Sequence, residues 1–76
     1  HDVDVVLSYE GRAYYCEIKS SETEGKKIYG PVIKKEKLEA WNKSNKQHGV
    51  LYDYRKKNKL VLYIWDAEGK RMQCEL

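Results

Sequence analysis

Residues 4–19 read DVVLSYEGRAYYCEIK, and this stretch decides the fold. Two runs rich in β-branched and aromatic residues, 2–9 and 12–19, flank the pair Glu10-Gly11, which has the composition of a tight turn. Two such runs joined by a short turn are typical of a β-hairpin. We therefore predict that the chain opens with two antiparallel strands.

Alternation of side chains along these strands places charged groups together on one face of the hairpin. Successive side chains of a strand point to opposite faces, so Glu17 and Lys19 share a face while Ile18 points the other way. Asp4, on the first strand, lies within cross-strand reach of that face. If Asp4 shares the Glu17 face, two carboxylates and an ammonium converge there, although charged side chains are uncommon on a sheet unless they have partners.

This trio of charged residues has the chemistry needed to hydrolyse a phosphodiester. Magnesium prefers oxygen ligands and keeps several waters, so Asp4, Glu17 and the carbonyl of Ile18 are the candidate ligands of Mg²⁺ or Mn²⁺. Lys19 would orient or deprotonate the attacking water and offset charge that develops on the phosphate. The alternative is a solvent-facing strand surface on which Glu17 and Lys19 form an ion pair of little energetic value.

The rest of the chain predicts one helix and two or three further strands. Residues 20–29 read as a polar loop, and a helix begins at about Pro31 or Lys34 and ends at Gln47, where His48 would face the C-terminal end of the helix dipole. Strands follow at 50–54 and 60–65 around a turn at 56–59, and 71–76 is a short edge strand. The apolar side chains expected in the core are Leu38, Trp41, Tyr52, Tyr63, Ile64 and Trp65.

These elements predict an α/β (α+β) fold in a single domain that spans 1–76. Their order is β-β-α-β-β with a possible fifth strand, so we expect a mixed sheet of four to five strands with one main helix on one face. A chain of 76 residues buries only a thin core. A partner subunit would supply further support.

Positive charge is concentrated in the middle third of the sequence. The whole chain has 15 Lys and Arg against 12 Asp and Glu, a net charge of +3, which agrees with an acidic partner. Tyr29 is a candidate either to stack on an unpaired base or to anchor its loop. The lysines of this region would contact nucleic-acid phosphates or, equally well, solvate a loop and a helix; the candidates are Lys26, Lys27, Lys34, Lys35 and Lys37.

The two cysteines and the absence of a long apolar stretch favour a cytoplasmic protein. Cys16 and Cys74 lie in strand-like runs without the spacing of a zinc site, so we expect free, buried thiols in a reducing compartment. The sequence shows neither a signal peptide nor the roughly 20 apolar residues of a membrane span. Because the chain starts at His1 directly in strand-like sequence, we expect a fragment or a tag remnant at that end.

The stretch Asp4-Val5-Val6, a turn and Cys16-Glu17-Ile18-Lys19-Ser20 resembles the PD-(D/E)xK nuclease motif, in which an Asp on one strand and a Glu-x-Lys on the next form the catalytic site. The similarity is strongest to Holliday junction resolvases of the archaeal type. Lys27-Ile28-Tyr29 in the loop, the helix with Leu38 and Trp41, and the last strand pair follow in the order of that family. The resemblance covers nearly the whole chain and implies a restriction-endonuclease-like core.

That resemblance implies a magnesium-dependent endonuclease that cuts branched DNA in recombination and repair and works as a homodimer. Two departures stand out: Val3 replaces the Pro of the motif, and the acidic residue that resolvases carry on a helix before the first strand has no counterpart here. Without that residue the metal site would be incomplete, completed by Asp2, or lost along with activity. The alternatives are an inactive DNA-binding module, a nuclease of this superfamily with another DNA substrate, and a small protein-interaction domain that uses residues 50–65.

Overall fold

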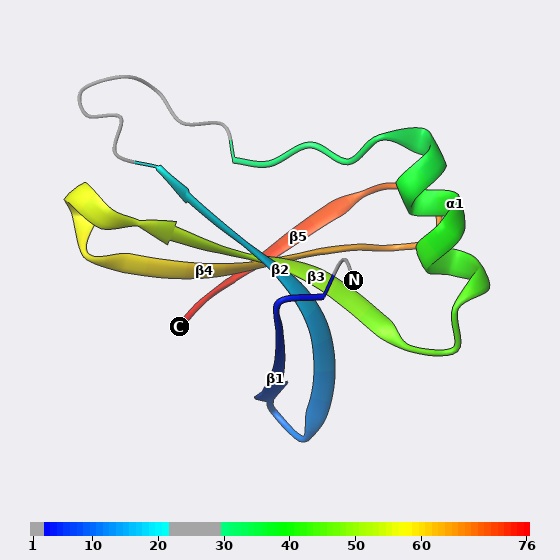
Figure 1. Ribbon diagram of the computed structural model, residues 1–76, viewed down its shortest axis with the longest axis horizontal. Coiled ribbons are helices and arrows are strands. Elements are labelled where there is room, and N and C mark those ends of the chain that lie inside the picture. The colour runs from blue at the N-terminus through cyan, green and yellow to red at the C-terminus, as the bar shows by residue number, and fades with distance from the viewer. Residues whose placement is uncertain (1–2, 22–29) are drawn as a thin grey trace.

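The computed structural model describes residues 3–21 and 30–76, in which five strands form a single mixed sheet with one α-helix (Figure 1). The sheet order is β1-β2-β3-β4-β5, with β2 and β3 parallel and every other pair antiparallel. The predicted α+β class and the mixed sheet are confirmed. The elements are β1 Val5–Tyr9, β2 Arg12–Ser21, α1 Lys35–Lys43, β3 Gln47–Tyr54, the 3-10 turn Arg55–Lys57, β4 Lys59–Trp65 and β5 Arg71–Glu75.

The predicted hairpin forms with the predicted turn. Glu10 and Gly11 both have positive φ, 50° and 80°, as the two central residues of a type I′ turn require. The register then pairs Val5 with Cys16 and Leu7 with Tyr14. Asp4 lies just outside β1, so the first strand is shorter than the predicted run 2–9.

The connection from β2 to β3 carries α1 and differs from the sequence prediction at its end. The helix ends at Lys43 rather than Gln47, because Ser44 takes an extended conformation and its Oγ accepts a hydrogen bond from the Lys46 N–H at 3.1 Å. His48 is therefore not at a helix end. It lies within β3, paired with Tyr15 of β2, and the expected interaction with the helix dipole is wrong.

Parallel pairing with β3 also lengthens β2. Ser20 and Ser21, predicted as the start of the loop, pair with Asp53 and Tyr54 and extend the strand. The edge strand predicted at 71–76 is present as β5, where Trp65 pairs with Arg71. Residues 22–29, the remainder of the predicted loop, lie outside the described part of the chain.

The sheet has an apolar cluster on each face. On the face that carries α1, the buried residues are Val50, Tyr54, Val61 and Tyr63. On the other face Tyr14, Cys16 and Leu62 are buried, and side chains from both edge strands pack on them, among them Tyr9 of β1 and Cys74 of β5. Side chains of the two edge strands therefore cover part of this second cluster.

The helix lies at one end of the sheet, and none of its residues is buried (Figure 1). Trp41 is half-buried and packs against the α1-side cluster together with Trp65. Of the six residues predicted as core, Tyr63 alone is buried and the other five are half-buried. The reason is geometric, because a helix of nine residues covers only part of one face of the sheet, and the opposite face, on which Ile64 packs, carries no helix.

Both cysteines are free thiols, as predicted, but they differ in burial. Cys16 is fully buried, and burial raises the pKa of its thiol to about 11. Cys74 is half-buried rather than buried, because β5 is an edge strand. Among the described residues no helix is long and apolar enough to cross a membrane.

Candidate active site

Asp4 is fixed to the middle of β2 by two hydrogen bonds. Its backbone N–H donates to the carbonyl of Cys16 at 2.9 Å, and its carboxylate Oδ2 accepts the backbone N–H of Ile18 at 2.9 Å. The register of the hairpin would place Asp4 opposite Glu17, but the first of these bonds departs from that ladder. These two bonds hold the Asp4 carboxylate beside Ile18, on the side of β2 that faces β1.

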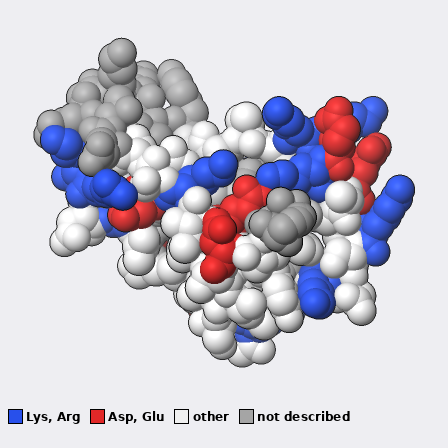
Figure 2. Space-filling view, in the orientation of Figure 1, with Lys and Arg blue, Asp and Glu red and all other residues white. Residues whose placement is uncertain are grey.

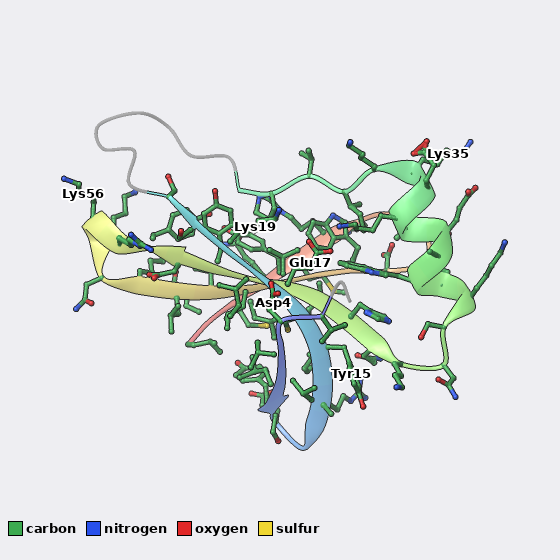
Figure 3. All side chains as sticks on the ribbon, viewed as in Figure 1. Asp4, Tyr15, Glu17, Lys19, Lys35 and Lys56 are labelled. Atoms are coloured by element: carbon green, nitrogen blue, oxygen red, sulfur yellow. The ribbon has the colours of Figure 1, made fainter. Side chains whose placement is uncertain are left out.

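Glu17 lies on the face of the sheet that carries α1. Its side chain is only 13% exposed, and its carboxylate forms ion pairs with Lys37 of α1 and, at 4.0 Å, with Lys19. Glu17 and Lys19 therefore share one face of β2, as predicted. Figure 3 labels Asp4, Glu17 and Lys19 along the middle of β2, where β1 begins.

The carbonyl of Ile18 is directed toward the edge of β2 that Asp4 occupies. In a strand the N–H and C=O of one residue point to the same side, and the Ile18 N–H is bonded to Asp4. Ile18 is 49% exposed, and its side chain lies on the opposite face from Glu17. The two carboxylates and this carbonyl thus come from three positions that the hairpin brings together.

All three groups are oxygen donors, the ligand type that a hard divalent cation prefers. Magnesium is commonly held by one or two carboxylates plus waters, and a carboxylate has about four lone-pair sites, so one hydrogen bond to Asp4 leaves capacity for an ion. No group of three or more His, Cys, Asp or Glu in residues 3–21 and 30–76 could hold a metal. Any cation at Glu17 would also meet the ammonium of Lys37, which already lies on the same carboxylate.

The lysines predicted to contact nucleic acid divide into three groups. Lys37 faces Glu17, whereas Lys34 and Lys35 are exposed at the start of α1. Lys26, Lys27 and Tyr29 fall outside the described residues. On the face shown in Figure 2, acidic side chains gather near the middle of the sheet, with Lys and Arg side chains on both sides.

Aromatic residues beside the acidic group were not singled out from the sequence as part of a site. Tyr15, two residues before Glu17, shares its face, and the parallel register brings His48 next to Tyr15. The pKa of His48 is lowered by burial and by the nearby Lys46 ammonium, while Glu17 opposes this shift. The alternation of β2 could have revealed Tyr15, but His48 was expected at a helix end.

Comparison of the chain with protein-family models, curated proteins and solved structures gives no match.

Proposed function

We propose that this chain is a metal-dependent endonuclease with a restriction-endonuclease-like core, which hydrolyses phosphodiester bonds of branched DNA as a homodimer. The observation that carries the proposal is the bond between the Asp4 carboxylate and the Ile18 amide, next to a Glu17 carboxylate that is paired with Lys19. Two carboxylates and an ammonium on one hairpin are the group that the Asp and Glu-x-Lys motif predicts.

The residues divide the work of hydrolysis by their chemistry. Asp4, Glu17 and the Ile18 carbonyl would hold Mg²⁺ or Mn²⁺, which would supply Lewis-acid charge and make water more acidic. Lys19, with its side chain 57% exposed, orients the attacking water and balances negative charge on the phosphate. Water adds to phosphorus and one P–O ester bond breaks, leaving a phosphate monoester and a hydroxyl.

Lysines at the start of α1 supply positive charge that a polyanion would need. Lys34 and Lys35 are exposed at the N-terminal end of α1, the element that also carries Lys37 to Glu17. Phosphate contacts by such lysines give affinity that falls as salt concentration rises. Branched DNA is proposed as the substrate because of the resemblance to resolvases described above.

A catalytically inactive DNA-binding module is the second candidate, and the ion pair between Lys37 and Glu17 favours it. An ammonium on the Glu17 carboxylate already balances the charge that a divalent cation would balance. Such a module would bind junctions through its lysines without cutting them. This candidate predicts that Mg²⁺ causes no cleavage and changes junction affinity only through ionic strength.

The test is cleavage of a labelled four-way junction with Mg²⁺ or Mn²⁺. We expect product with the unmodified chain and none with Asp4→Asn, Glu17→Gln or Lys19→Ala, while each variant keeps junction binding in a gel shift. Glu39→Gln and Lys70→Ala, which change exposed charges elsewhere, are the matched controls and should cut normally. A gel shift without product from the unmodified chain would favour the inactive module.

A further inference from the structure

A groove lined by aromatic rings opens beside Glu17, between α1 and the pair β2 and β3. Its volume is about 380 Å³, within the range of roughly 300–1,000 Å³ that is typical of small-ligand sites. Tyr15, Trp41 and His48 supply the rings, and Glu17 and Lys37 are also part of its lining. The groove is therefore continuous with the acidic group of the candidate active site.

The rings are arranged for stacking. Trp41 and His48 are stacked, with ring centres 5.2 Å apart and planes 11° apart, and Tyr15 is tilted against His48 at 6.1 Å. Each of these three side chains is half-buried, so each has ring surface within the protein and ring surface accessible from outside. The neutral imidazole that the lowered pKa of His48 favours adds a flat, uncharged surface at neutral pH.

Two lysines lie over these rings. The Lys46 ammonium is 4.7 Å from the centre of the Tyr15 ring, and that of Lys37 is 6.0 Å from the Trp41 ring. A cation over an exposed ring is held by at most about 1 kcal/mol, so a flat group that stacks on the ring can displace the lysine ammonium. A nucleotide supplies both replacements, because its base stacks on the ring while its phosphate pairs with the displaced ammonium.

The spacing along β2 connects the groove to the chemistry. Tyr15 and Glu17 are two residues apart on the same face, about 7 Å along the strand. The two side chains are therefore neighbours on one surface rather than parts of two remote sites. A phosphate at Glu17 and Lys19 would thus have an adjacent base at Tyr15.

We infer that this groove binds the unpaired nucleobase of a nucleotide adjacent to the phosphate at Glu17, stacked on Tyr15 and His48, with Lys46 on the flanking phosphate. The inference rests on the proposed nuclease function and specifies its substrate, namely DNA with an unpaired or extruded base next to the cut. A base fits better than an apolar peptide because the lysines at the groove match an anionic backbone.

The first experiment measures affinity without cleavage. We would use the Glu17→Gln variant in EDTA with junctions in which a single abasic site is moved along each strand. Stacking of a base on an aromatic side chain contributes about 1–3 kcal/mol, so an abasic site at one position should weaken binding by roughly five- to 150-fold. Adding Tyr15→Leu should remove this difference, whereas Tyr15→Phe, which keeps the ring, should retain it.

The second experiment locates the base. A 5-iodouracil placed at the sensitive position and irradiated should crosslink to Tyr15 or His48, as identified by mass spectrometry. Circular dichroism melting of each variant checks that it folds. Equal affinity for every abasic junction, or a crosslink only outside the groove, would overturn the inference while leaving junction cleavage untouched.

The two proposals can fail separately. If the unmodified chain never cuts but the abasic effect and the crosslink are present, the groove assignment holds and the nuclease proposal is wrong. If the chain cuts and neither effect is seen, the nuclease proposal holds and the groove does not bind a base.

Lys46→Gln should weaken junction binding several-fold and reduce its salt dependence, compared with Lys43→Gln as the control.

Discussion

The ammonium of Lys37 lies on the carboxylate of Glu17, and this ion pair connects α1 to the centre of β2. The helix has no buried residue, so contacts of this kind and the half-buried Trp41 hold it on the sheet. The same carboxylate is the proposed metal ligand. The Glu17 side chain therefore contributes to the position of α1 and would also take part in the proposed cation binding.

Replacing Lys37 should strengthen metal binding. Lys37→Met removes the ammonium that competes for Glu17, and since the ion pair is partly exposed we expect a gain of at most about 1 kcal/mol, or up to fivefold in affinity. Titration of Mn²⁺ by electron paramagnetic resonance, without DNA, measures this. Lys35→Met is the control and should leave the affinity unchanged; weaker Mn²⁺ binding by Lys37→Met would show that Lys37 supports the site.

Asp4 should have separable effects on stability and on cleavage. Asp4→Asn keeps an oxygen acceptor for the Ile18 amide, so the free energy of unfolding should change little while cleavage is lost. Asp4→Ala leaves that amide without its side-chain partner and should cost about 0.5–1.5 kcal/mol. Urea denaturation compares the two variants. An equal loss of stability in both would contradict the role given to this hydrogen bond.

Protonation of His48 should destabilise the protein at acidic pH. Burial lowers its pKa in the folded state below the ordinary 6.5, so the unfolded chain binds the proton more tightly. The contribution of His48 to stability is therefore present above pH 6.5 and is lost as pH falls through the lower folded pKa. His48→Gln should show a smaller fall in urea midpoint between pH 7.5 and 5 than the unmodified chain. A parallel fall in both would refute this prediction.

The two thiols should react at different rates. The pKa of Cys16 is raised to about 11 by burial, so at pH 8 almost none of it is thiolate, whereas Cys74 is half-buried on an edge strand. One equivalent of a thiol reagent should react quickly in the native protein and two in urea. Cys74→Ser should abolish the fast phase, and Cys16→Ala should not.

Close packing at Gly49 should make it intolerant of a side chain. A Cβ at this position would lie 2.8 Å from the backbone oxygen of Tyr63 and 3.2 Å from the Leu62 side chain. Gly49→Ala should therefore cost about 1–3 kcal/mol by overpacking. Gly11→Ala, where a Cβ meets nothing within 4 Å but φ is +80°, tests backbone strain alone. Thermal melting of both variants measures the difference.

Local pattern alone was sufficient for the hairpin and for the common face of Glu17 and Lys19. The turn at Glu10-Gly11 and the two-residue period of β2 are properties of neighbouring residues, so no distant contact is needed to infer them. The existence of α1 and of β5 was likewise predictable. The end of α1 was not, because helix propensity continues to Gln47 while the pairing of Gln47 with Tyr14 draws that residue into β3.

What the sequence by itself determined is therefore the set of elements and which charges share a strand face. Tertiary structure decided that Asp4 bonds the Ile18 amide, that Lys37 reaches Glu17, and that His48 lies beside Tyr15. The physical reason is that these contacts join residues 14 to 33 positions apart. Such contacts depend on strand register and on where a helix docks, which composition and periodicity do not specify.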